Sequence, residues 1–249
     1  MCEGMEGHSL VASADAPTVI HTSSRKRPNY DETRDIHAHI ESINASSPSQ
    51  FAHRYCPQLR NTFTTKDGNA DIDVELYAAS ELSSADFMAC FQLLKHTSFA
   101  AYKSSSRGWR PEAKKAEMRD EDMRYLLVRR FSNDGAVGAF LSFMLTIEDD
   151  FPVIYVYEIH LASGMRRCGL GKRLMHIVED IGCRARVAKA MLTVFTSNSR
   201  AEGFYRNLGY TDDEFSPRPR KLRRGVTKRP DYIIMSKSLN PSDALLEGG

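Results

Sequence analysis

The sequence lacks the paired cysteines that a disulfide framework or a structural zinc site would need. Its five cysteines are an odd number, and no two of them form a Cys-x-x-Cys pair. None of the eight histidines has His-Glu-x-x-His spacing, and the close pair of His37 and His39 has no third ligand beside it. We therefore expect no metal site, no structural disulfide and a reducing compartment.

Long apolar runs are missing as well. No apolar stretch approaches the roughly 20 residues that are needed to cross a bilayer. The N-terminal stretch contains Glu3, Glu6 and Asp15 and no apolar core, so we expect no signal peptide. These absences predict a soluble intracellular protein without membrane contact.

Neither sign of charge dominates, because 34 Lys and Arg residues stand against 32 Asp and Glu residues. The net charge of +2 therefore predicts no particular partner. One segment differs, since residues 217–230 carry only basic charges. We interpret this segment either as a solvated loop or as a basic loop that contacts nucleic acid or acts as a nuclear address. Its charges come from Arg218, Arg220, Lys221, Arg223, Arg224, Lys228 and Arg229.

Composition and patterning divide the chain into four segments. Residues 1–30 are rich in Ser, Thr and Pro without periodicity and are predicted to be a disordered arm. Residues 31–70 are predicted to form a short helix and then irregular chain, both packed on the core. A single folded domain is expected over 71–240, followed by a disordered tail over 241–249.

The order of periodic segments predicts the fold class. Antiparallel strands come first, followed by strand, helix, strand, helix and strand, which favours an α/β fold with a mixed central sheet. Ser83 or Ser84 is a suitable cap for an early helix, and Pro111 opens another. Strands are predicted over 71–76, 125–131, 136–148, 153–161, 191–196 and 232–236, and later helices over 169–187 and 199–208.

A glycine-containing turn lies between a predicted strand and a long amphipathic helix. Gly169 and Gly171 have no Cβ, so the backbone there can turn sharply and approach a ligand closely. The unpaired N–H groups and positive dipole end of the helix then favour an anion, and Arg166, Arg167 and Lys172 add positive charge. A diphosphate is the expected ligand. The alternative is that two glycines simply end a loop.

The motif Arg-x-x-Gly-x-Gly at 166–171, placed after a strand and before a helix, resembles the coenzyme A turn of the GNAT acetyltransferases. A second signature of that family follows from Asn198 to Tyr210. The resemblance implies the GNAT fold, a single domain with helices flanking the mixed sheet, and acetyl-CoA as cofactor. It implies that the cofactor is held by Ile159, His160, Leu161, Arg166, Arg167, Cys168, Gly169, Leu170, Gly171, Lys172, Thr193 and Asn198.

A narrower resemblance covers roughly residues 85–237 and is to N-terminal α-amine acetyltransferases of the NatD type. It is carried by Tyr155–Leu161, Arg166–Lys172 and Met191–Phe195, with Gly108-Trp109 upstream. It implies acetylation of histone N-terminal tails that begin Ser-Gly-Arg-Gly, without an obligate auxiliary subunit. It also implies a location in the nucleus and cytoplasm.

Two residues are expected to carry the chemistry. Glu158 is the expected general base for the α-amine, and its apolar sequence neighbours predict a raised pKa. Tyr205 is the expected proton donor to the leaving thiolate, and the alternative for this side chain is packing against the cofactor.

Four residues are expected to bind the peptide. Tyr102, Tyr157 and Tyr232 would line a groove, and Glu148 would bind the Arg side chain of the third residue. The sequence departs from the NatD pattern at Thr146, where a second acid is expected, and at Arg107, where an aromatic is expected.

Two other functions fit the same motifs. One is a GNAT enzyme that acetylates lysine side chains or small amines. The other is a non-catalytic coenzyme A-binding module of chromatin.

Overall fold

The computed structural model describes residues 30–57, 59, 63–64, 71–129, 135–221, 223 and 227–239. The predicted disordered arm over 1–30, except for residue 30 itself, and the predicted disordered tail over 241–249 lie outside these residues. None of the helices in the described ranges is long and apolar enough to cross a membrane.

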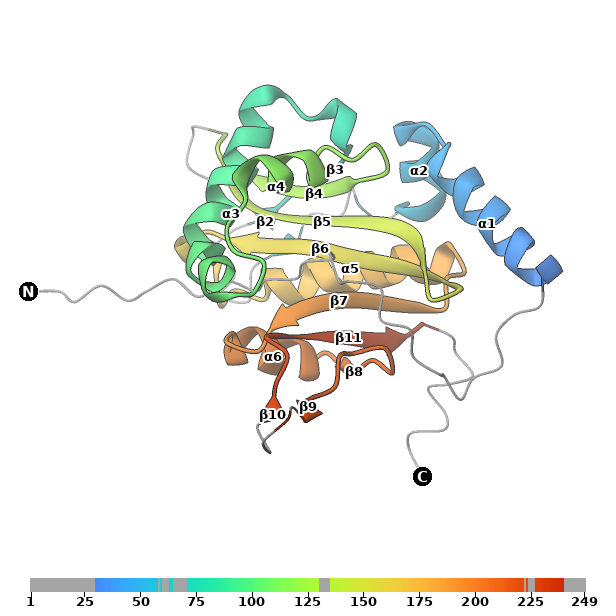
Figure 1. Cartoon of the computed structure of the whole chain (residues 1–249). Helices are drawn as coiled ribbons and strands as arrows, with labels where there is room; N and C mark the ends of the chain where they lie inside the picture. The colour runs from blue at the N-terminus through green and yellow to red at the C-terminus, as the bar shows by residue number, and fades with distance from the viewer. Residues whose placement is uncertain are drawn as a thin grey trace, which may run out of the picture.

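A seven-stranded sheet runs through the molecule in the order β3-β4-β5-β6-β7-β11-β8 (Figure 1). β6 and β7 are parallel, and the other neighbouring pairs of this sheet are antiparallel. The strands are β3 (Val74–Ala78), β4 (Arg124–Arg129), β5 (Val137–Glu148), β6 (Phe151–Leu161), β7 (Lys189–Phe195), β8 (Thr211–Asp212) and β11 (Tyr232–Ser238). Two small antiparallel pairs lie outside this sheet, β1 (Phe63–Thr64) with β2 (Asp71–Ile72), and β9 (Arg220–Lys221) with β10 (Thr227–Lys228).

Helices cover both faces of the sheet, as predicted for a mixed α/β fold (Figure 1). α3 and α4 lie on one face, and α5 lies on the other together with α1 and α2. The helices are α1 (Tyr30–Asn44), α2 (Pro48–Tyr55), α3 (Ser84–Ser104), α4 (Pro111–Glu117), α5 (Leu170–Arg184) and α6 (Ser199–Arg206). Single 3-10 turns lie at η1 (Ala79–Glu81) and η2 (Ser163–Met165).

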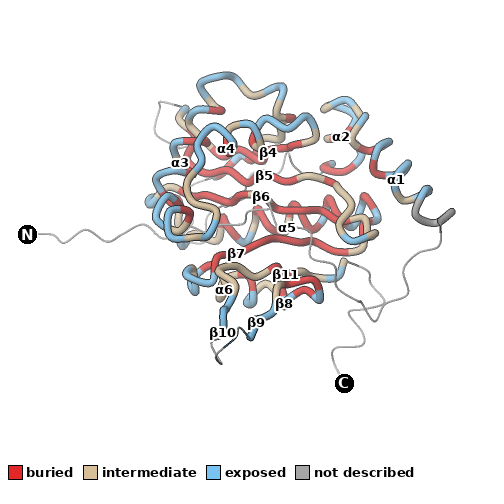
Figure 2. Tube along the Cα trace, in the orientation of Figure 1, coloured by how far each residue is buried: buried red, intermediate tan, exposed pale blue. Residues whose placement is uncertain are grey.

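The alternation of side chains along β4 explains why the sheet is buried on both faces (Figure 2). Leu126 and Val128 belong to the apolar cluster that includes α5. Tyr125 and Leu127 belong to the cluster that includes α3. Consecutive residues therefore anchor opposite helical layers, and the sheet is the middle layer of three.

Three local predictions were wrong. The chain after residue 45 was expected to be irregular, yet α2 forms there, because Ser47 accepts a hydrogen bond from the Gln50 N–H and Pro48 occupies the first turn. The strand predicted over 71–76 is interrupted at Asp73. The segment 217–230 is not only loop, since β9 and β10 pair within it.

Candidate active site

A β-bulge in the middle of β6 places two consecutive side chains on one face of the sheet. Glu158 pairs with Ser142 of β5 and Val156 pairs with Phe143, so Tyr157 has no partner in the register. Tyr157 packs against the cluster that contains Tyr102, and Glu158 accepts a hydrogen bond from the Tyr102 hydroxyl. In a regular strand these two side chains would point to opposite faces.

The parallel pair of β6 and β7 opens just before this bulge. Its described pairing ends at Val156 and Leu192, although both strands continue. The Ala162 N–H donates to the Gly138 carbonyl on the β5 side at 2.8 Å. Since N–H groups alternate along a strand, those of Ile159 and Leu161 point to the opposite edge, into the opening. An extended ligand can pair with this edge as an additional strand would.

The turn before α5 presents backbone donors at the same end of the sheet. Gly169 is the N-cap of α5 with φ of 91°, and no side chain caps the helix. The first turn contains no acidic residue, and the preceding Arg167 also has a positive φ, of 66°. Arg166 Nε donates to the Leu161 carbonyl at 2.9 Å, which ties the turn to the end of β6. The start of α5 thus leaves N–H groups without a side-chain cap, which suits an anion, and diphosphate binding there stays a prediction.

Glu158 is fully buried and accepts from three side chains. Its Oε1 lies 2.7 Å from the Tyr102 hydroxyl and 2.7 Å from Lys114 Nζ, and its Oε2 lies 2.7 Å from His160 Nε2. The lysine also forms an ion pair with Glu117 one turn along α4. These contacts come from α3, α4 and β6, so the environment of the carboxylate is polar.

In this environment the pKa of Glu158 shifts in the direction opposite to the one expected. Burial alone would raise the pKa, but the ammonium of Lys114 and the hydrogen bond to His160 outweigh it and lower the pKa of Glu158 below its ordinary value. The prediction of a raised pKa was therefore wrong. It followed from the apolar sequence neighbours of Glu158, whereas the groups that contact the carboxylate lie on other elements.

His160 links Glu158 to α3. Its Nδ1 lies 2.7 Å from Thr97 Oγ1, and that hydroxyl also donates to the Leu93 carbonyl at 2.7 Å. The imidazole is fully buried. Thr97 and His160 therefore fix the orientation of the carboxylate from the side opposite Lys114.

Tyr205 belongs to α6, which packs on β7, and its side chain lies on the other face of the sheet. It is fully buried in the cluster that includes α5, and its hydroxyl has no hydrogen-bond partner among the described residues. Burial, and to a smaller extent the charge of Glu158, raises the pKa of Tyr205. A buried hydroxyl without a partner is costly, which is consistent with a site that a ligand completes.

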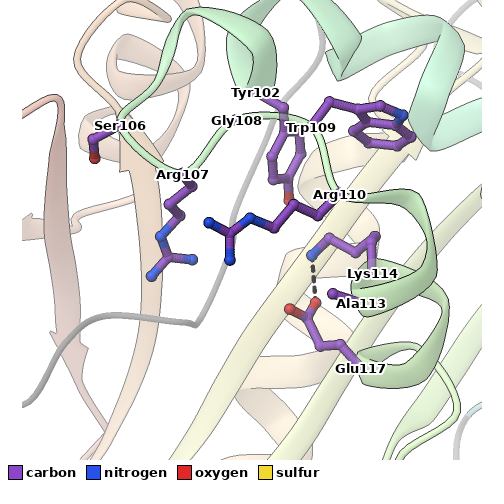
Figure 3. Close-up of a pocket in the computed structure, with 9 residues that line it drawn as sticks. All are labelled: Tyr102, Ser106, Arg107, Gly108, Trp109, Arg110, Ala113, Lys114 and Glu117. Atoms are coloured by element: carbon purple, nitrogen blue, oxygen red, sulfur yellow. Dashed lines mark hydrogen bonds and ion pairs between the residues drawn. The ribbon is translucent and has the colours of Figure 1, made fainter.

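A cavity of about 370 Å³ lies directly beside Tyr102 and Lys114 (Figure 3). In Figure 3 the side chains of Arg107 and Arg110 extend across it, and Lys114 and Glu117 form its lower wall. The loop that carries Arg107 is tied down, because the Ser106 N–H donates to the Asp231 carboxylate. The cavity therefore leads from the surface to the partners of Glu158.

Comparison with known proteins identifies this arrangement. Residues 87–210 match the Acetyltransferase (GNAT) family. The chain contains a GNAT acetyltransferase domain. The matched span runs from α3 to the residue after Gly209 and so includes the bulge, the opening, the turn and Tyr205.

Individual relatives match over longer stretches of the chain than the family does. N-alpha-acetyltransferase 40 of Saccharomyces cerevisiae is 36% identical over 157 residues, and the match covers 53% of this chain and 53% of the yeast protein. The chain thus spans about half the length of this relative. The ribosomal-protein-S18-alanine N-acetyltransferase of Escherichia coli is 18% identical with a TM-score of 0.46, covering 67% of this chain and 94% of that one. An acetyltransferase of Streptococcus agalactiae is 12% identical with a TM-score of 0.49, covering 67% and 98%.

GNAT acetyltransferases use acetyl-CoA, and the residues present in the GNAT domain fit that cofactor. The uncapped start of α5 suits the diphosphate, and the unpaired edge of β6 at Ile159 and Leu161 suits the amides of the pantetheine arm. The unpartnered hydroxyl of Tyr205 suits the sulfur at the end of that arm.

Two residues expected at the cofactor have contacts within the protein. Asn198 caps α6, because its Oδ1 accepts from the Ala201 N–H at 3.1 Å. The Thr193 hydroxyl lies 2.7 Å from the Tyr155 hydroxyl. Cofactor contact by these two residues stays a prediction. The sulfur of Cys168 donates to the Met165 carbonyl at 3.3 Å, so it stabilises the turn itself.

The expected peptide-binding residues lie along one face of the sheet. Tyr157 and Tyr232 are half-buried on that face, and Arg107 lies over the Tyr232 ring at 5.9 Å. Glu148 pairs with Phe151 at the far end of the β5–β6 ladder, whereas Glu158 pairs with Ser142. Burial and the neighbouring Asp149 raise the pKa of Glu148.

The sequence reasoning missed Lys114 and the side-chain role of His160. Lys114 is one of several charged residues in a polar segment, and its partner Glu158 is distant in the sequence. A signal was present, since Pro111 at the helix start places Lys114 and Glu117 on one face of α4.

Proposed function

We propose that the chain transfers the acetyl group of acetyl-CoA to the N-terminal α-amine of proteins that begin Ser-Gly-Arg-Gly, as histone tails do. The observation that carries the proposal is the buried carboxylate of Glu158 at the bulge, where the parallel strands open beside the unpartnered hydroxyl of Tyr205. The name of the yeast relative, an N-alpha-acetyltransferase, supports an α-amine as acceptor.

Acetyl-CoA, when bound, supplies an activated acetyl thioester. The amides at the start of α5 would hold its diphosphate, and those of Ile159 and Leu161 would orient the arm. Because the pKa of Glu158 is lowered, its carboxylate is ionised at neutral pH and ready to accept a proton. An attacking amine nitrogen becomes strongly acidic as its new bond forms, so even a weakly basic carboxylate can then remove its proton. Tyr205 would donate a proton to the sulfur.

The peptide would lie along the face that carries the tyrosines. Tyr157 and Tyr232 would bind its backbone near the amine, and Tyr102 would act through the hydrogen bond it donates to Glu158. Glu148, at the far end of the ladder, would bind the Arg side chain of the third residue. Arg107, which lies in the cavity, would keep that side chain away from the Glu158 end.

The basic hairpin, defined as β9, β10 and their flanking residues 218–229, would contact nucleic acid. Arg218, Arg220, Lys221 and Lys228 are exposed, and no acid lies within 217–230. The hairpin leads into Asp231, which binds the loop at the cavity, so nucleic acid held there would lie near the substrate entrance. The enzyme would act without an auxiliary subunit, in the nucleus and cytoplasm.

The α-amine assignment is tested with three peptides and mass spectrometry of the products. The first begins Ser-Gly-Arg-Gly with a free amine, the second has that amine blocked and contains a lysine, and the third begins with a different residue. Acetylation of the first peptide alone supports the proposal. Acetylation of the lysine in the blocked peptide would instead assign the enzyme to side-chain amines, and no product with any amine would favour a binding module.

The role of the basic hairpin is tested separately. Replacing Arg218, Arg220 and Lys228 by Gln should weaken binding to duplex DNA and reduce its salt dependence. Turnover of the short peptide should stay within twofold of the wild type. Unchanged DNA binding would remove the nucleic-acid role and leave a solvated hairpin.

A further inference from the structure

A cluster of alternating charges joins α4 to the bulge of β6. Lys114 Nζ lies 2.7 Å from Glu158 Oε1 and also forms an ion pair with Glu117. Its side chain is only 6% exposed, and its ammonium lies 5.2 Å from the centre of the Tyr102 ring. A lysine is rarely buried to this extent unless its charge is matched.

The local sequence explains how the lysine reaches the sheet. Pro111 starts α4, and the two residues Lys114 and Glu117 are three positions apart, so they share the face that packs on the strands. Burial alone would lower the pKa of Lys114, but Glu158 and Glu117 raise it well above its ordinary value. The lysine is therefore a fixed positive charge between two carboxylates.

Building on the function proposed above, we propose that Lys114 is a positioning residue for acetyl transfer, whose ammonium holds Glu158 as an oriented carboxylate. Glu117 has a subordinate role, because it forms a second ion pair with the ammonium at the wall of the cavity, while Glu158 alone suffices to keep Lys114 charged. Without Lys114 the buried carboxyl group would keep its contacts with Tyr102 and His160 but lose the ammonium that opposes the effect of burial, and its pKa would rise toward protonation. A protonated Glu158 could not accept the proton of the substrate.

The groups around Glu158 determine how its protonation depends on pH. His160 on the same strand and Lys114 on α4 favour the carboxylate, and Glu117 on α4 pairs with Lys114. The carboxylate contacts Tyr102, Lys114 and His160, and its charge also acts on Tyr125 and Tyr205. The pKa of each of the three tyrosines is raised, so they stay neutral across the working range.

The test compares kcat/KM of Lys114→Met and of the wild type from about pH 6 to about pH 9 on the free-amine peptide. Both enzymes use the same peptide, so the titration of its amine cancels when kcat/KM of the variant is divided by kcat/KM of the wild type. We expect the ratio to fall about tenfold for each pH unit on the acid side, because Glu158 is protonated there in the variant. A ratio that is the same at every pH would overturn the proposal, since lost packing affects all pH values equally.

Two matched variants sharpen the result. Lys114→Arg keeps the positive charge, so its ratio to the wild type should not depend on pH. Glu117→Gln breaks the other ion pair of Lys114 but leaves the cation beside Glu158, so its ratio should also be independent of pH. If Lys114→Arg shows the same fall as Lys114→Met, the charge is not what matters and the proposal is wrong.

A stability readout serves if Lys114→Met folds but is too inactive for kinetics. Lys114→Met should lower Tm less in the Glu158→Gln background than in the wild type, because the carboxamide needs no cation. An equal loss of Tm in both backgrounds would overturn the proposal. Failure of the proposed function is distinguishable, since it would appear first as a wild-type enzyme that does not acetylate the peptide amine.

Discussion

Tyr157 and Glu158 are neighbours in the sequence, yet both side chains lie on the face of the sheet that α3 and α4 cover. The bulge in β6 causes this, because it removes Tyr157 from the register with β5. The same irregularity lies next to the point where β6 and β7 stop pairing. The bulge therefore places an aromatic ring and a carboxylate next to the opening between β6 and β7, where a ligand can bind.

Replacing Glu158 by Gln should lower kcat by about 10²- to 10⁴-fold, the usual contribution of a general base. Coenzyme A should still bind with unchanged affinity, because the α5 turn is not altered. The measurement is steady-state kinetics on the Ser-Gly-Arg-Gly peptide together with a titration of coenzyme A. Glu112→Gln is the control, since Glu112 is an exposed residue of α4 whose partner is Lys115. Wild-type turnover of Glu158→Gln would show that the carboxylate is not the base.

Tyr205→Phe should change stability and activity in opposite directions. The hydroxyl is buried without a partner among the described residues, so its removal should raise the free energy of unfolding by about 1 kcal/mol. Turnover should fall by about 10²-fold if this hydroxyl protonates the leaving sulfur. Both quantities can be measured on the same preparation by denaturant unfolding and peptide kinetics.

Tyr125→Phe is the matched control for that experiment. Tyr125 is equally buried, but its hydroxyl donates to the Met118 carbonyl at 2.5 Å. This variant should lose about 1 kcal/mol of stability and keep its turnover. A Tyr205→Phe enzyme with full activity would leave packing against the cofactor as the role of Tyr205.

Much of the fold could be predicted because its determinants are local. Phe87, Phe91, Leu94 and Ser98 recur at helical spacing and are all buried in α3, and Ser83, one of the two expected caps, caps that helix. The α5 turn was recognised from two glycines and its flanking charges. These features depend on spacing along the chain, which a sequence displays directly.

The pKa shift of Glu158 could not be predicted, because the groups that cause it are distant in the sequence. The apolar residues beside Glu158 in the sequence do not surround its carboxylate, which instead meets Tyr102 from α3 and Lys114 from α4. Which helix residue reaches a strand depends on how helices pack on the sheet. The bulge could not be predicted either, because nothing in the sequence from Tyr155 to Leu161 indicates which residue is left unpaired in the strand register.

Gly169→Ala should weaken coenzyme A binding. Gly169 has a φ of 91°, in the left-handed region where an L-residue costs about 1–2 kcal/mol. The strain would shift the first amides of α5, so the dissociation constant should rise about tenfold or more. Gly164→Ala is the control in the preceding η2 turn, where a Cβ would meet no atom within 4 Å. Equal affinity in both variants would place the diphosphate elsewhere.

The pH dependence of the wild-type enzyme should follow the substrate amine and not Glu158. The pKa of Glu158 is lowered, so its carboxylate is already ionised well below neutral pH. The α-amine has a pKa of about 8, and only its neutral form attacks. On the acid side, log(kcat/KM) should therefore rise by about one unit per pH unit and level off near pH 8. A slope of about two would mean that a second group loses its proton in the same range. Glu158 would then have the raised pKa that its sequence neighbours first suggested, and Lys114 would not be holding it as a carboxylate.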